Sequence, residues 1–110
     1  MFNTQKLNEV LLELGHPDNL SGTEFIRLGA AMYDRQLSMT KELYPAIAKA
    51  VGSTPSRVER AMRHSICTAW SRGDSEAQKR YFGSTVNPNT GTPTVGEYLA
   101  RLHRICCHAD

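Results

Sequence analysis

Apolar residues recur along this chain of 110 residues at spacings of three and four, and no segment alternates convincingly between apolar and polar residues over five or more positions. Spacings of three and four place side chains on one face of an α-helix, whereas alternation is the pattern of a half-buried strand. The sequence therefore predicts an all-α fold. A chain of this length has room for one hydrophobic core, so we expect one domain over residues 1–110.

Glycine, proline and capping residues divide the chain into about six expected helices. The first is short and ends at Gly15, and the second begins at Ser21, where Ser21 and Glu24 have the spacing of a capping box. Turn-forming residues at 83–93 predict a loop. The remaining helices are expected at 41–51, 55–71 and 75–81, and from Thr94, which has Glu97 three residues on.

Two of these helices carry an apolar stripe that predicts a buried face. Small residues at 29–31 would in addition let another helix approach the second helix closely. The stripe of the second helix comprises Phe25, Leu28, Gly29, Met32 and Tyr33, and that of the last helix comprises Tyr98, Leu99, Leu102 and Ile105.

The third and fourth expected helices are joined by about three residues that include Gly52, which is the arrangement of a helix-turn-helix over about 41–71. Gly52 permits a left-handed turn. Thr54 followed by Pro55 is a favourable helix start, because threonine caps free amides and proline has no amide to leave unpaired. A plain helical hairpin inside a bundle has similar requirements, so the pattern alone leaves both interpretations open.

The positive charge of the chain is concentrated in its centre. The net charge is +2 overall, but it is −2 over residues 1–40, +4 over 41–80 and zero over 81–110. On the fourth expected helix, apolar residues and cations fall on different sides. The apolar side comprises Val58, Ala61, Met62, Ile66 and Ala69, and the basic side comprises Arg57, Arg60, Arg63 and His64.

A basic helix face after a tight turn is typical of a recognition helix that enters the major groove of double-stranded DNA. Arg57 and Arg60 lie in the amino-terminal half of the helix, and arginine pairs with guanine through two hydrogen bonds. Glu59 would accept a bond from cytosine or orient a neighbouring arginine. The other interpretation is a solvated helix face on which Glu59 and Arg63 form an ion pair.

Five sequence segments between residues 43 and 73 together carry a resemblance that extends beyond the fourth expected helix. They are Leu43-Tyr44-Pro45, Ile47-Ala48-Lys49, Ser56-Arg57-Val58-Glu59-Arg60-Ala61, Arg63-His64 and Ala69-Trp70-Ser71-Arg72-Gly73. This set closely resembles the DNA-binding effector domain of the sporulation master response regulator, stage-zero sporulation protein A. The resemblance covers nearly the whole chain, because the flanks agree at Leu14-Gly15, Pro17, Gly22, Phe82-Gly83 and Pro93-Thr94.

The resemblance implies about six helices around a helix-turn-helix, similar to winged-helix effectors of response regulators but without a clear wing. It implies a transcription regulator that binds short promoter boxes in double-stranded DNA, often as tandem dimers, and is nucleoid-associated. Carried over to this sequence, the base-reading positions are Arg57, Glu59 and Arg60, and the positions close to the DNA backbone are Ser56, Arg63 and His64.

Two departures from the family pattern bear on regulation. The family's effector follows a phosphorylatable receiver domain, whereas this chain begins a few residues before its first expected helix. We therefore expect no receiver domain in residues 1–110, which are either a fragment or a stand-alone effector. At the Cys67 position the better-known relatives carry an acidic residue, within a patch that contacts the sigma factor of RNA polymerase. In this chain the position is a cysteine, so the acidic residue of that patch is missing.

Other functions are weighed against DNA binding. A helical module that binds a related regulator or RNA polymerase without reading DNA is the main alternative, and a metal-responsive regulator using His103 and Cys106 is a weaker one. His103, Cys106, Cys107 and His108 resemble a metal cluster, but no second Cys or His pair has finger-like spacing, so we expect no metal and no cofactor.

We also expect neither an enzyme nor a membrane protein. The sequence lacks a P-loop, a dinucleotide-binding glycine fingerprint, a His-Glu-x-x-His motif and a nucleophile elbow. It has no run of 18 apolar residues and no signal-peptide layout at its amino terminus. Three cysteines do not make a disulfide framework, and reduced thiols fit a cytoplasmic protein.

Overall fold

The computed structural model describes residues 2–16, 21–83 and 91–107. Within these ranges the chain forms six α-helices and one π-helical turn, without strands, which confirms the all-α fold class. The elements are α1 (Thr4–Glu13), α2 (Ser21–Met32), η1 (Met39–Leu43), α3 (Tyr44–Val51), α4 (Pro55–Arg72), α5 (Ser75–Phe82) and α6 (Val95–Cys107).

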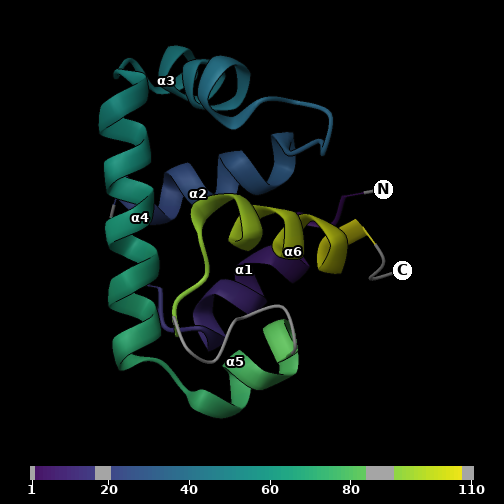
Figure 1. The fold of residues 1–110 in the computed structure, drawn as a ribbon. Helices are drawn as coiled ribbons and strands as arrows, with labels where there is room; N and C mark the ends of the chain where they lie inside the picture. The colour runs from purple at the N-terminus through teal and green to yellow at the C-terminus, as the bar shows by residue number, and fades with distance from the viewer. Residues whose placement is uncertain (1, 17–20, 84–90, 108–110) are drawn as a thin grey trace.

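Helix α4 stands along one side of the molecule, and the other helices are arranged beside it (Figure 1). Helix α3 lies at the amino-terminal end of α4, and α5 lies at its carboxyl end. Helices α2 and α6 pack against α4 between these two ends. The start of α1 and the end of α6 lie on the side away from α4 (Figure 1). The core draws buried side chains from all six α-helices.

Three of the predicted helix starts and ends are confirmed in atomic detail. Thr54 precedes α4, and its hydroxyl accepts a hydrogen bond from the Arg57 amide at 3.3 Å. A complete capping box opens α6, because the Glu97 amide donates to the Thr94 hydroxyl and the Thr94 amide donates to the Glu97 carboxylate. Gly15 takes a left-handed φ of 90° just after α1. Most of the loop predicted at 83–93 lies outside the described residues.

The helix predicted at 41–51 is divided into the π-helical turn η1, which begins at Met39, and α3, which begins at Tyr44. Pro45 has no amide, and its ring would clash with the carbonyl four residues before it. The chain avoids this clash with the π-helical turn η1, in which the Tyr44 amide donates to the Met39 carbonyl. The start signal that the prediction missed is Ser38, whose hydroxyl accepts from the Lys41 amide at 3.2 Å.

The predictions for α2 were partly wrong. Ser21 is the first residue inside the helix and not its cap, and the Glu24 carboxylate pairs with Arg27 at 3.3 Å. The buried face is turned by about one residue from the predicted stripe, because α2 packs through the small residues at its start. Of the predicted stripe, Gly29 is buried, Phe25, Leu28 and Tyr33 are half-buried, and Met32 is exposed. Of the small residues at 29–31, Ala31 is exposed. The buried residues of α2 are Gly22, Thr23, Ile26, Gly29 and Ala30.

At Gly22 the backbone of α2 lies close to α4. A Cβ atom on Gly22 would lie 2.5 Å from the Ala61 carbonyl oxygen and 2.7 Å from the Ser65 Cβ, both closer than real Cβ atoms come. Gly29 lies farther along α2, where an added Cβ would lie 2.9 Å from a Leu99 methyl group. Glycine at these two positions therefore sets how close α2 lies to its neighbours.

A buried histidine joins three distant parts of the chain. His16 follows the turn after α1, and its Nε2 lies 2.6 Å from the Tyr98 hydroxyl of α6 while its Nδ1 lies 3.0 Å from the Ser65 hydroxyl of α4. Hydroxyl groups both donate and accept, so either neutral tautomer of the ring is fully paired. Burial, with a smaller contribution from the Arg27 cation, lowers the pKa of His16 from 6.5 to about 4. The imidazole is therefore neutral at pH 7.

We predict that Gly22→Ala destabilises the protein by about 1–3 kcal/mol, because its methyl group overpacks the α2–α4 crossing. Gly96→Ala in α6 is the matched control, since an added Cβ there meets the Met39 side chain at 3.9 Å, an ordinary contact. The control should stabilise by about 0.5–1 kcal/mol through helix propensity. Urea unfolding measures both changes, and equal effects of the two substitutions would contradict the close crossing.

We further predict that stability falls between pH 7 and pH 5 because of His16. The unfolded chain binds a proton at this residue below pH 6.5, whereas the folded chain does not until about pH 4. The resulting loss is about 2 kcal/mol at pH 5. Urea unfolding of the wild type and of His16→Gln at pH 7 and pH 5 isolates the part of this loss that is due to His16. A wild-type loss no larger than that of the variant would show that His16 is not the group responsible.

Candidate nucleic-acid interface

The turn between α3 and α4 is formed by Gly52 in the left-handed conformation, with φ 70° and ψ 40°. The Ser53 amide donates to the Ala48 carbonyl at 2.9 Å, which closes the end of α3 in the way typical of helices that end at a glycine. Ala48 is buried, as are Ile47 of α3 and Val58 of α4. The turn and the apolar residues on both sides of it therefore fix the start of α4 relative to α3.

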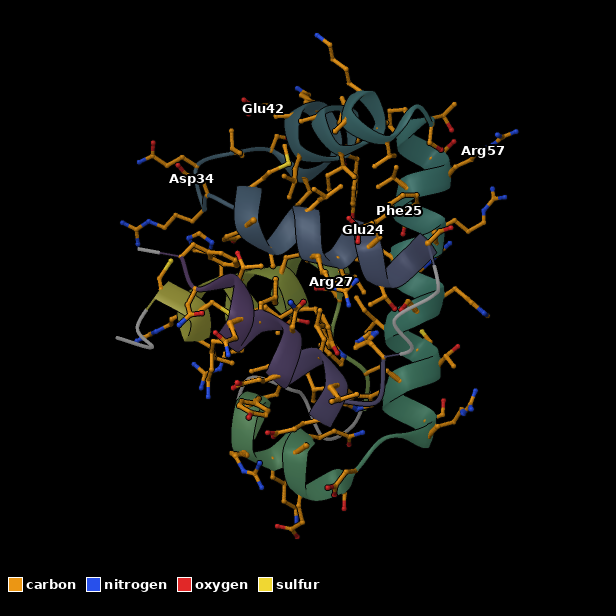
Figure 2. All side chains as sticks on the ribbon, turned by 180° about the vertical axis from the view of Figure 1, so that it is seen from behind. Glu24, Phe25, Arg27, Asp34, Glu42 and Arg57 are labelled. Carbon is orange, nitrogen blue, oxygen red and sulfur yellow. The ribbon has the colours of Figure 1, made fainter. Side chains whose placement is uncertain are left out.

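Helix α4 has one buried side and one exposed side, as its sequence pattern predicts. Ala61 is half-buried rather than fully buried, and Ser65, which the prediction did not include, is buried. Arg57 projects from α4 away from the other helices (Figure 2). The buried residues are Val58, Met62, Ser65, Ile66 and Ala69, and the exposed residues are Ser56, Arg57, Arg60, Arg63 and His64.

Glu59 differs from the other residues predicted to contact DNA. Its side chain is 32% exposed, and its carboxylate forms an ion pair with Arg63 at 3.3 Å. Glu59 and Tyr44 of α3 line the same hollow. Burial raises the pKa of the Tyr44 hydroxyl, and the Glu59 carboxylate raises it further. The ion pair of the solvated-face interpretation is thus present. Ion pairs this exposed contribute at most about 1 kcal/mol, so its main effect is on where Arg63 points.

A hollow of about 410 Å³ lies beside this ion pair. It is formed by the inner flank of α4, by Tyr44 of α3 and by the segment 92–96 that leads into α6. Glu59 and Arg63 stand on its wall together with Cys67, whose thiol is exposed. Sequence reasoning missed this hollow, because the segment that forms it is about thirty residues away along the chain.

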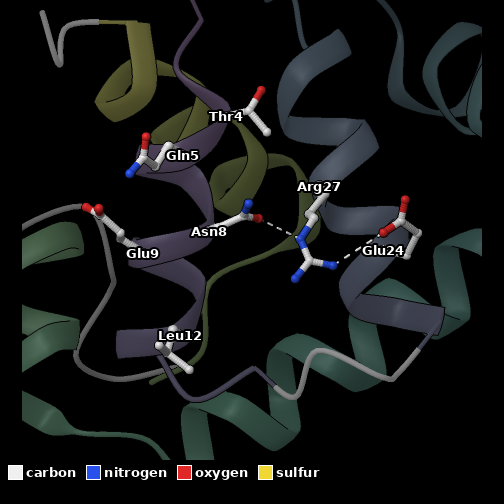
Figure 3. Close-up of a pocket in the computed structure, with 7 residues that line it drawn as sticks. All are labelled: Thr4, Gln5, Asn8, Glu9, Leu12, Glu24 and Arg27. Carbon is white, nitrogen blue, oxygen red and sulfur yellow. Dashed lines mark hydrogen bonds and ion pairs between the residues drawn. The ribbon is translucent and has the colours of Figure 1, made fainter.

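A second hollow, of about 570 Å³, lies between α1 and α2. Figure 3 shows Arg27 reaching from α2 toward α1, where its Nε donates to the Asn8 side chain at 2.8 Å and its guanidinium also bonds to Glu24. Leu12 is the exposed apolar residue on its wall. The arginine therefore links the two helices across the hollow.

The residues weighed as metal ligands lie on different faces of α6. Cys106 is fully buried, whereas His103 lies 3.4 Å from the Cys107 sulfur. Over the ranges that the structure describes, no three His, Cys, Asp or Glu side chains group closely enough to hold a metal ion. His108 lies outside those ranges. No described helix is long and apolar enough to cross a membrane.

An all-α fold in which a long helix follows a tight glycine turn, packs one side on the core and exposes arginines on the other is an arrangement that helical DNA-binding domains share. A comparison with protein-family models gives the particular family. The chain belongs to the family described as sporulation initiation factor Spo0A C terminal, whose model matches residues 7–105. This match confirms the resemblance and makes the chain a DNA-binding effector domain of the sporulation-initiation type, a family of transcription factors rather than enzymes.

Proposed function

We propose that this protein binds double-stranded DNA in a sequence-specific manner and regulates transcription, with α3 and α4 acting as a helix-turn-helix over about 41–71. The observation that supports the proposal most directly is the exposed pair Arg57 and Arg60 on the first two turns of a helix whose opposite side is buried in the core. The major groove is about 12 Å wide and admits such a helix.

In this proposal Arg57 and Arg60 read base edges. They follow the Thr54 cap directly and lie on the exposed side of the helix, near its amino terminus. This is the part of a recognition helix that reaches the floor of the groove. A guanidinium that bonds to both O6 and N7 of guanine discriminates by about 1–3 kcal/mol against other bases.

The remaining site residues hold the helix on the sugar-phosphate backbone. Ser56 offers a hydroxyl at the amino terminus of α4, where the helix dipole favours a phosphate. Arg63 and His64 are exposed one turn beyond Arg60. Glu59 acts by orienting Arg63 through the ion pair, because its half-buried carboxylate is already bonded to that guanidinium.

The family also implies promoter boxes in tandem and a sigma-factor contact. We propose that two copies of the chain bind adjacent boxes. Cys67 is exposed on α4 beyond the residues proposed to read DNA, so it is accessible for the polymerase contact, but it carries no charge where the relatives have an acid. Activation through this position is therefore expected to be weak.

We predict different binding defects for Arg57→Ala and Arg63→Ala. Arg57→Ala should lower affinity for the preferred box by about 1–3 kcal/mol while leaving affinity for an unrelated duplex nearly unchanged. Arg63→Ala should weaken binding to both duplexes and reduce the salt slope by about one. Fluorescence anisotropy with the two duplexes over a range of salt concentrations measures both quantities.

Arg80→Ala is the matched control for these variants. Arg80 is an exposed arginine of α5, outside the proposed interface, and it pairs with Glu13 at 2.8 Å. The Arg80→Ala variant should bind both duplexes with the affinity of the wild type. If Arg57→Ala lowers affinity for both duplexes equally, α4 does not read bases at Arg57. If neither Arg57→Ala nor Arg63→Ala changes binding, the alternative of a module that binds another regulator or polymerase is favoured.

A further inference from the structure

We propose that Cys107 is a nucleophilic thiol, with His103 as its general base, that exchanges with low-molecular-weight disulfides. Both residues lie in the last turns of α6, four residues apart, and the Cys107 sulfur is 3.4 Å from His103 Nε2. This inference rests on the geometry of that pair and not on the proposed DNA binding.

The protonation of His103 follows from its second hydrogen bond. His103 Nδ1 lies 2.8 Å from the carbonyl oxygen of Ala30 in α2, and a carbonyl only accepts. Nδ1 therefore carries a proton, and in the neutral ring Nε2 presents its lone pair to Cys107. The Cys107 thiol is the donor in this bond, so the proton that must leave the sulfur already points at a base.

The imidazole is also held in place by aromatic rings from two other segments. The Phe2 ring stacks on it with centroids 5.5 Å apart and an interplanar angle of 25°, and the Tyr33 ring lies 5.9 Å away. A nucleophile, a base within hydrogen-bond reach and a third group that orients the base are the parts of an activated-thiol site. Here the third group is the Ala30 carbonyl, supported by the two rings.

The three thiols of the chain differ in ways that set Cys107 apart. Cys67 is exposed, but the described part of the chain offers its sulfur no hydrogen-bond partner. Cys106 is fully buried, and burial raises the pKa of its thiol to about 11. Cys107 is partly exposed and has the histidine. Reactivity at neutral pH is thus expected at Cys107, although Cys67 is the more accessible.

The surroundings of His103 favour an anionic disulfide. A hollow of about 430 Å³ beside the imidazole is lined by Arg35 and Arg104 as well as Asp34, a net charge of +1. Arg104 lies three residues before Cys107 and hence on a neighbouring part of the same helix surface. A carboxylate on the incoming disulfide would be attracted to these arginines.

The exchange is balanced within the two reactants. His103 Nε2 takes the proton of Cys107 as its sulfur attacks one sulfur of the disulfide, so a new S–S bond forms while the original one breaks. Cys107 is oxidised, and the departing half of the disulfide is reduced to a thiolate that takes up the proton from His103. Because the carboxyl end of a helix disfavours an isolated thiolate, the transfer to His103 is what supplies the nucleophile.

The first test uses the wild-type protein and a limiting amount of dithiobis(nitrobenzoate), an anionic aromatic disulfide. After a brief reaction at pH 7, peptide mapping by mass spectrometry gives the labelled fraction of each cysteine in the same molecules. We expect Cys107 to be labelled about tenfold faster than Cys67, because its thiol is activated. Labelling of Cys67 at an equal or higher rate would overturn the proposal.

The second test removes the base. The variant with Cys67→Ser and Cys106→Ala leaves Cys107 alone, and it is compared with the same protein carrying His103→Gln and with a Cys67-only protein made by Cys106→Ala and Cys107→Ser. At pH 7 the labelling rate of Cys107 should fall about tenfold in the His103→Gln variant, to the rate of the Cys67-only protein. An unchanged rate would contradict the role of His103. If circular dichroism shows that His103→Gln does not fold, the wild-type labelling ratio decides.

Discussion

The buried imidazole of His16 connects the parts of this fold that the chain itself keeps far apart. Its two nitrogens bond to Ser65 in α4 and to Tyr98 in α6, and the Gly15 turn brings it there from the end of α1. All three polar groups are shielded from water, so a helix that moved would leave at least one of them unpaired, at a cost of about 1–3 kcal/mol. Ser65 directly follows His64, which makes this buried bond an anchor for the surface proposed to contact DNA.

Further contacts of α4 fix the position of its exposed arginines. Gly22 lets α2 lie against the backbone of α4 at Ala61, one residue after Arg60. The left-handed Gly52 and the Thr54 cap then fix the first turn, which carries Arg57. A side chain mounted on a helix held at several points is placed more precisely than one on a loop. The proposed base-reading arginines therefore lie on a helix that is held in place at several points.

Much of this arrangement could be predicted from sequence, because it depends on local chemistry. The Thr54-Pro55 start, the Thr94–Glu97 capping box and the two sides of α4 follow from backbone hydrogen bonding and helical periodicity. The errors occur where a distant contact or a backbone constraint overrides the local pattern. The face of α2 is set by its crossing with α4 at Gly22, and the wide turn η1 is set by Pro45. The partners of His16 and the carbonyl that orients His103 required coordinates, since sequence spacing identifies neither the Ser65 hydroxyl nor the Ala30 carbonyl as a partner.

The central claim, that α4 reads a specific DNA sequence, is tested most directly by equilibrium binding to a promoter box of the family and to a scrambled duplex of the same length, each at two salt concentrations. The account predicts a preference for the box of about a thousandfold or more that persists at the higher salt, while affinity for the scrambled duplex falls steeply. Equal affinity for the two duplexes at both salt concentrations would contradict it, because the arginines of α4 would then be acting as charges alone.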